Sequence, residues 1–275
     1  MNRSRKSNAT TNSHEEHQVE QMAKLPSRLI YEIIRLDGEE ELERPMMALV
    51  FSGLAAGLLI SASVFGEAIL AANLPASPVS FLVENFGYSL GFLLVIIARL
   101  QLFTENTITT ILPLAADPAP AMFAKVARLW LAVLTANVIG AASAAAFLTQ
   151  SGVLDDAVAQ AMLSIAQHAT SFGATEGFLK AIPAGVLIAA IVWMLPSADA
   201  SKFAVIVTFT WLIAAGDFLH IVAGTVECAI MILVGGLSFF DGLTNFFLPV
   251  LAGNIVGGTL VFTLLAWAQV KEEVE

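Results

Sequence analysis

Two apolar stretches of this sequence carry polar and charged side chains near their centres. In the stretch at about 82–115 these are Arg99, Gln101, Thr104, Glu105, Asn106 and Thr107. In the stretch at about 203–236 they are Asp217, His220, Thr225 and Glu227. His220 is the strongest candidate for chemistry, because a histidine beside a pore can donate a hydrogen bond to an anion or pass a proton near neutral pH. The alternative is a structural histidine that is hydrogen-bonded between helices.

The charged residues of these clusters favour a structural role. Charges within a membrane are costly and usually face a bundle interior or one another. Arg99 can pair with Glu105 or with an acid of the second stretch, where Asp217 and Glu227 lie. It can instead raise the positive potential that attracts an anion. We favour structural pairing for these four residues.

The elements that must position these groups are membrane helices. The chain is 57% hydrophobic and 13% charged, which is far from an average soluble domain. Six apolar segments are long enough to span a bilayer, at about 46–68, 82–115, 122–149, 177–196, 203–236 and 243–269. The second and fifth cover about 34 residues each, whereas about 20 suffice. Irregular backbone at membrane depth is tolerated only inside protein or beside water, so both are predicted to be helices broken near the midplane.

Sequence echoes indicate that the chain consists of two related halves. LAVLTANVIG at 131–140 matches LPVLAGNIVG at 248–257, and AAGLLISA at 55–62 matches PAGVLIAA at 183–190. Lys and Arg alternate between successive connections, which places both termini in the cytoplasm. Three spans then separate the echoed units, so the halves, at about 46–149 and 177–269, form an inverted repeat. The echoed Asn137 and Asn254 are expected to cap broken-helix backbone or to bond between helices.

The rest of the chain is assigned to tails. Residues 1–44 are predicted to be a cytoplasmic tail with an amphipathic helix from about 14 to 42, residues 45–270 a transmembrane channel domain, and residues 271–275 a second cytoplasmic tail. His14 and His17 fit a solvated tail better than a metal site. The net charge of −10 argues against nucleic acid. We expect no enzyme, metal or cofactor, because no nucleophile–base pair, nucleotide loop or metal-ligand cluster is evident.

Four short motifs follow one another along the membrane portion of the chain. They are Tyr88-Ser89-Leu90-Gly91, Leu102-Phe103-Thr104, Gly216-Asp217-Phe218-Leu219-His220, and Gly253-Asn254 with Gly257-Gly258. Together they resemble the formate/nitrite transporter family, in its less-characterised branch with an extended N-terminus. The resemblance implies an aquaporin-like, all-α protomer of six spans in a homopentamer in the bacterial inner membrane. Each protomer of that family has its own pore for small monovalent anions such as formate or nitrite.

The resemblance also assigns residues to the substrate path. These are His220, Thr104, Leu102, Phe103, Tyr88, Phe92 and Ile213. Thr104 would hydrogen-bond the central histidine, His220. Apolar constrictions would be formed by Tyr88, Phe92, Leu102 and Ile213, with Phe103 adjacent. The chain departs from the family pattern at Arg99, Gln101, Leu219 and Gly224, and the basic residue nearest to the expected outer mouth is Lys180.

We therefore predict a transmembrane channel or transporter for small monovalent anions, with pH-sensitive passage past His220. An anion would shed water at a constriction, meet Thr104 and His220, and cross as the neutral weak acid, because a bare ion in hydrocarbon is costly. One alternative is a pore for a small neutral solute. Others are a cation pathway along Asp217, Glu105 and Glu227, and a membrane scaffold with a vestigial pore.

Overall fold

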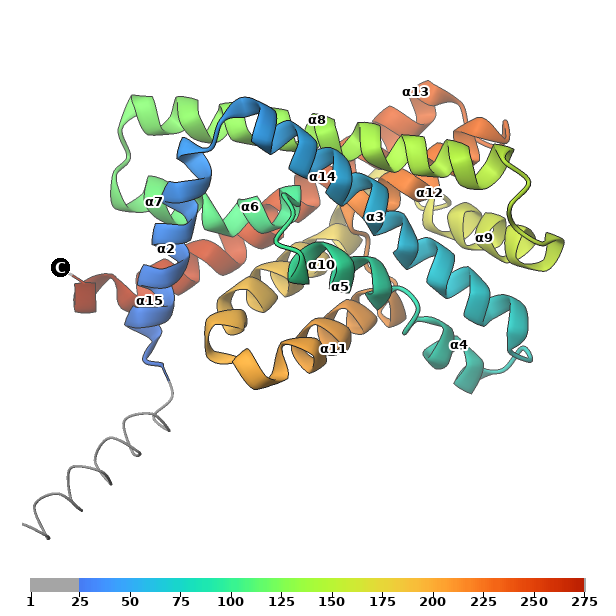
Figure 1. Ribbon diagram of the computed structural model, residues 1–275, viewed down its shortest axis with the longest axis horizontal. Coiled ribbons are helices and arrows are strands. Elements are labelled where there is room, and N and C mark those ends of the chain that lie inside the picture. The colour runs from blue at the N-terminus through green and yellow to red at the C-terminus, as the bar shows by residue number, and fades with distance from the viewer. Residues whose placement is uncertain (1–24, 275) are drawn as a thin grey trace, which may run out of the picture.

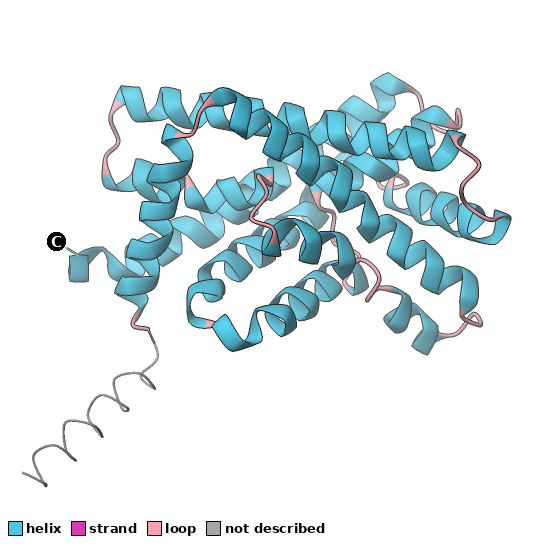
Figure 2. Ribbon diagram, viewed as in Figure 1, coloured by secondary structure: helices cyan, strands magenta, loops and turns pink. Residues whose placement is uncertain are grey.

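The structure, a computed structural model, describes residues 25–274. The first 24 residues of the predicted tail, with His14 and His17, lie outside the described residues. Within the described part every regular element is a helix, and short loops join the helices (Figure 2). This is the all-helical architecture that the apolar segments predict.

The first half of the chain runs from a surface helix through a broken span to a long helix. Its elements are α2 (Ser27–Glu43), α3 (Met46–Asn73), α4 (Pro78–Glu84), α5 (Ser89–Ile97), α6 (Phe103–Thr109), α7 (Ile111–Ala116) and α8 (Pro120–Gln150). Figure 1 shows α2 standing beside α7 and α15 at one end of the bundle. The helix α2 falls within the segment whose apolar spacing predicts an amphipathic helix, and its buried side chains include Ile30, Ile34 and Leu42.

The second half of the chain also contains an interrupted span. It contains α9 (Asp156–Ala169), α10 (Ala174–Met194), the 3-10 turns η1 (Leu195–Ser197) and η2 (Asp199–Ser201), α11 (Lys202–Ala215) and α12 (Ile221–Leu233). It ends in a long helical run made of α13 (Phe239–Asp241), η3 (Gly242–Phe247), α14 (Leu248–Ile255), η4 (Val256–Thr263) and α15 (Leu264–Val274). The segments η3 and η4 are π-helical.

Five helical segments in the described part are long and apolar enough to cross a membrane. They are Met46–Asn73, Pro78–Ile97, Pro120–Gln150, Ala174–Ser197 and Phe239–Glu272. The apolar helices α11 and α12 have 14 and 13 residues, each shorter than a full crossing. The chain is thus a multi-pass membrane protein whose second and fifth predicted spans are interrupted.

The two interruptions have the same backbone geometry. The helix α5 ends at Ile97 and α6 begins at Phe103, while α11 ends at Ala215 and α12 begins at Ile221. Each break contains a left-handed residue that is not glycine, Arg99 with φ 53° and Asp217 with φ 56°. Leu100 then donates its N–H to Val95, and Phe218 donates to Ile213, which closes each helix end with a six-residue Schellman bond.

Glycine contacts bring α3 onto α8 and α10 onto the last helical run. A Cβ on Gly57 would lie 2.2 Å from the Asn137 carbonyl oxygen, and a Cβ on Gly185 would lie 2.3 Å from the Asn254 carbonyl oxygen. These glycines occupy matching places in the echoed segments 55–62 and 183–190. Small residues allow such close helix approach in membranes, so the echoes mark where helix backbones touch.

The helix α9 is not among the elements predicted from the sequence, because it lies between the apolar segments at about 122–149 and 177–196. Its start has a standard signal, because the Asp155 side chain accepts a hydrogen bond from the Val158 N–H at 3.0 Å. Val158, Met162, Ala166 and Ala169 recur at helical spacing and are buried. These two features together were the signal that could have revealed the helix.

We predict that Gly57→Ala lowers the free energy of unfolding by about 1–3 kcal/mol, because the new methyl group would clash with backbone of α8. Gly173→Ala is the matched control, since a Cβ there meets nothing within 4 Å. Thermal unfolding of the detergent-solubilised protein measures both. Equal melting temperatures for the two variants would contradict the close approach of α3 and α8.

Candidate substrate pathway

The two broken spans meet in a hydrogen bond between Thr104 and His220. Thr104 is the second residue of α6, and His220 immediately precedes α12. The Thr104 Oγ1 and His220 Nε2 atoms are 2.7 Å apart, and each residue is only 1% exposed. The structure therefore brings together the two polar residues that the family resemblance assigns to the centre of the path.

The second ring nitrogen of His220 fixes how this bond is arranged. The Ala223 N–H donates to His220 Nδ1 at 3.3 Å, so Nδ1 carries no proton and the neutral ring carries its proton on Nε2. Nε2 then donates to the Thr104 hydroxyl oxygen. The hydroxyl proton of Thr104 is left free to be donated elsewhere, for example to a solute.

Two asparagines position the backbone on either side of this bond. Asn137 Oδ1 accepts from the Phe103 N–H at 2.9 Å, while its Nδ2 donates to the carbonyls of Gly53 and Gln101 at 2.8 and 2.9 Å. The side chain therefore links α3, α8 and the first break. Because it satisfies three buried backbone groups, water is not needed there.

Asn254 makes the same three bonds at the second break. Its Oδ1 accepts from the Ile221 N–H at 2.8 Å, and its Nδ2 donates to the carbonyls of Ala181 and Leu219 at 2.8 and 2.9 Å. Both asparagines are fully buried. Asn137 and Asn254 thus bond the first N–H groups of α6 and α12, as expected for side chains that cap broken helices.

Apolar side chains surround the Thr104–His220 pair. Phe92, Leu102 and Ile213 are completely buried. The Phe92 ring lies edge-on to the His220 ring, with centroids 4.9 Å apart, and the Tyr88 ring centroid lies 5.3 Å from that of Phe92. Phe103 instead packs edge-on against Trp130 of α8.

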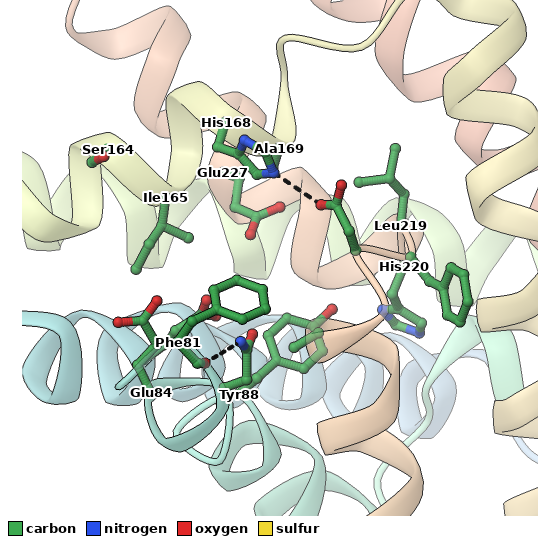
Figure 3. A pocket seen from close by; sticks show the side chains of 15 residues that line it. Phe81, Glu84, Tyr88, Ser164, Ile165, His168, Ala169, Leu219, His220 and Glu227 are labelled. Atoms are coloured by element: carbon green, nitrogen blue, oxygen red, sulfur yellow. Dashed lines mark hydrogen bonds and ion pairs between the residues drawn. The ribbon is translucent and has the colours of Figure 1, made fainter. Parts of the chain in front are cut away.

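Two cavities approach this apolar region from opposite ends of α5 and α11. We call the first the Glu227 cavity; it has a volume of about 310 Å³ and is lined by Glu67, Glu84, Tyr88, Asp217, His220 and Glu227 (Figure 3). We call the second the Arg99 cavity; it has a volume of about 720 Å³ and is lined by Asp37, Glu41, Arg99, Gln101, Glu105 and Lys202. Phe92, Leu102 and Ile213 border neither cavity.

The charged side chains of the breaks pair differently from the sequence expectation. Arg99 contacts Asp37 of α2 at 3.6 Å, with the arginine side chain 80% exposed, rather than Glu105 or an acid of the second broken span. The left-handed backbone at Arg99 ends α5, and its side chain lies in the Arg99 cavity instead of inside the bundle. Asp217 contacts Lys180 at 2.8 Å and His168 at 3.0 Å.

Two glutamates that the sequence grouped with these charges have no such partner. Glu105 Oε1 is buried without a hydrogen bond. Glu227 is 6% exposed, and no side chain among the described residues bonds to its carboxylate. The four predicted structural charges therefore separate into two paired residues, Arg99 and Asp217, and two carboxyl groups, those of Glu105 and Glu227, without a partner among the described residues.

Glu41 of α2 is a residue that sequence reasoning missed. Its carboxylate accepts from Thr109 Oγ1 at 2.7 Å, Gln101 Nε2 at 3.2 Å and Asn106 Nδ2 at 3.2 Å. Burial of the group raises its pKa. Glu41 thus attaches the surface helix to the first break, and no signal in a run of acidic residues distinguishes it from its exposed neighbours.

Comparison with known proteins gives a consistent family assignment. A family model described as "Formate/nitrite transporter" matches residues 28–268. "Inner membrane protein YfdC" of Escherichia coli is 44% identical over 252 residues, which cover 91% of this chain and 81% of that protein. "Formate channel FocA" of Haemophilus influenzae is 26% identical over 244 residues, or 79% of this chain and 84% of that protein.

Solved structures share the fold. One described as "Pentameric formate channel with formate bound" superposes with a TM-score of 0.68 at 20% identity, covering 84% of this chain and 98% of that chain. Another described as "FNT family ion channel" has a TM-score of 0.68 at 24% identity, covering 88% and 96%. At these identities the structural match supports the fold alone.

Replacing either framing asparagine should destabilise the protein. Asn137→Ala and Asn254→Ala each leave one backbone N–H and two carbonyls without a protein partner, and each unsatisfied buried group costs about 1–3 kcal/mol. We expect similar losses of melting temperature for the two variants. Asn245→Ala, which loses one exposed bond to Asp241, is the control and should melt like the wild type. A large loss at one asparagine only would contradict their equivalence.

Proposed function

Because the chain belongs to the formate/nitrite transporter family, we propose that it conducts small monovalent anions, formate- or nitrite-like, through a pore that passes Thr104 and His220. A member of this family is a membrane transporter and not an enzyme. The proposed path runs from the Glu227 cavity, past Tyr88 and Phe92, to the Arg99 cavity. Leu102 and Ile213 complete the apolar part, with Phe103 supporting the break behind it.

The observation that carries this proposal is the free hydroxyl proton of Thr104. His220 Nε2–H donates to the hydroxyl oxygen of Thr104, so the hydroxyl proton of Thr104 remains available for a further hydrogen bond. Thr104 is buried between the two cavities. A donor placed there can replace part of the hydration shell of an anion. The helix α12 also begins here, immediately after His220. Its N-terminus is the positive end of a half-helix dipole, which favours negative charge.

The apolar region explains why passage would depend on pH. Tyr88 borders one cavity and Ile96 the other; eight residues of helix separate them by about 12 Å. Moving an ion through such a region is costly, and protonation to the neutral acid removes most of that cost. Flux should therefore rise as the pH falls, because a larger fraction of the anion is protonated.

The proposed pore is formed by two inverted halves. The contacts of Asn137 and Asn254, and the left-handed residues Arg99 and Asp217, support a repeat in which 46–149 corresponds to 177–269. We propose an aquaporin-like protomer of six spans within a channel domain at 45–270, with both termini in the cytoplasm. The Arg99 cavity, which α2 borders, then faces the cytoplasm, and the Glu227 cavity faces outwards.

The cellular setting is proposed by likeness to relatives. The inner membrane protein of Escherichia coli suggests the bacterial inner membrane, and the pentameric formate channel suggests a homopentamer. The runner-up function is a pore for a small neutral solute, which the fully buried Phe92, Leu102 and Ile213 favour. A vestigial pore in a membrane scaffold is the third possibility that the experiment must separate.

We predict that proteoliposomes containing the full chain take up formate or nitrite faster at acid than at neutral pH, since the neutral acid crosses the apolar region more readily. Protein-free liposomes provide the background rate, and an osmotic swelling assay with glycerol tests the neutral-solute pore. Swelling without anion uptake would replace the proposal by that pore. A rate equal to the background for every solute would favour the scaffold.

A second prediction concerns the Thr104–His220 pair. Thr104→Val and His220→Asn should each lower anion flux about tenfold, equivalent to about 1.4 kcal/mol of barrier. The double variant should be no slower than the slower single variant, because all three lose the same bond. Thr208→Val, at an exposed position of α11, should leave the flux unchanged. Independent, multiplying losses in the double variant would show that the two residues do not act together.

A further inference from the structure

The Glu227 cavity has a charge balance that is unexpected for the mouth of an anion path. Four carboxyl groups line it, those of Glu67, Glu84, Asp217 and Glu227. Asp217 is paired with Lys180 and His168, and no ion pair or hydrogen bond within the described residues involves the other three carboxylates. An anion that enters this cavity therefore meets like charges unless protons enter with it.

Glu227 differs from the other acids in its position. Its exposed fraction is only 6%. It lies seven residues after His220, two turns further along the same face of α12. Figure 3 shows its carboxylate directed from α12 into the cavity, between His168 on one side and Phe81 and Tyr88 on the other. It is thus an unpaired buried carboxyl group beside the apolar region.

The surroundings of Glu227 include other titratable groups. Glu67 faces the cavity from α3, Glu84 and Tyr88 from the second span, His168 from α9, and Asp217 and His220 from the second break. Cys228 follows on α12, and its Sγ lies near Gly242. The described parts of α8, η3, α6 and α14, which also pack on α12, contribute no residue to the cavity lining. Glu67 and Glu84 are partly exposed, whereas Glu227 is buried.

His220 is poorly placed to supply a proton to a solute. Its Nδ1 accepts from the Ala223 N–H, and its Nε2 proton is donated to Thr104. Both ring nitrogens are therefore occupied within the protein. Glu227 is a buried carboxyl group of this cavity that makes no hydrogen bond or ion pair within the described residues, so its proton is available to whatever occupies the cavity.

We propose that Glu227 is the proton donor that converts the anion into its neutral acid before the anion crosses the apolar region. The O–H bond of the Glu227 carboxyl group breaks, its electron pair remains on the carboxylate, and the proton forms a new O–H bond on the anion. Water protons then reload Glu227 through the cavity. This inference rests on the proposed anion transport, and it makes the outward-facing cavity the site where proton and anion are joined.

The test measures formate uptake by proteoliposomes of the full chain at several external pH values, after subtraction of protein-free liposomes. Glu227→Gln should lose at least about tenfold of the wild-type rate at neutral pH, as removal of a positioned acid does. At acid pH the variant should approach the wild-type rate, because formic acid then forms in bulk water. Glu227→Asp should keep the wild-type pH profile. Glu176→Gln, at an exposed acid at the start of α10 outside the cavity, is the matched control.

The outcomes separate the inference from the proposed function. A wild-type pH profile in Glu227→Gln would overturn the inference and leave anion transport intact. Uniform loss at every pH in both the Gln and the Asp variants would also overturn it, because that pattern indicates a structural role. Absence of anion uptake by the wild-type protein would overturn the proposed function itself. Size-exclusion chromatography of each variant shows whether it retains the wild-type assembly.

Discussion

The structure depends on satisfying backbone hydrogen bonds where two helices are interrupted inside a bilayer. Water is scarce there, so each free N–H or carbonyl needs a partner from the protein. Asn137 and Asn254 provide these partners with the same three bonds at each break. Once the breaks are stable, Thr104 and His220 can meet between them. The geometry at the centre of the proposed path therefore depends on two buried amide side chains that lie outside it.

The two breaks share their backbone geometry but carry different side chains. A shift of 118 residues carries Arg99 onto Asp217 and Phe103 onto Ile221, and each pair has matching geometry or matching bonds. The same shift carries Leu102 onto His220 and Thr104 onto Val222. The backbone conformation and its hydrogen bonds are therefore alike at the two breaks, whereas the side chains at 102 and 104 differ in chemistry from those at 220 and 222. This difference gives one polar pair on an otherwise apolar path.

Much of this arrangement could be predicted from the sequence. Segment length and central polarity predict the breaks, and the family resemblance implies the hydrogen bond between Thr104 and His220. The helix α9, with 14 residues, is too short to be recognised as a membrane span, so only its N-cap and the spacing of its buried residues indicate it. The partners of Arg99 and Glu41 were beyond prediction, because both depend on how α2 docks onto the first break. Docking of a surface helix follows from three-dimensional shape, as in the contact of Gly38 with the Thr109 carbonyl.

The left-handed residues at the breaks also affect how the pore moves. Glycine adopts this conformation freely, whereas a residue with a side chain does so at a cost of about 1–2 kcal/mol and with fewer alternatives. Arg99 and Asp217 therefore make each break a stiff joint rather than a flexible hinge. Ion pairs with Asp37 and Lys180 restrain both side chains further. Opening of the proposed path is then expected from rotations of individual side chains such as the buried Phe92 rather than from bending at the breaks.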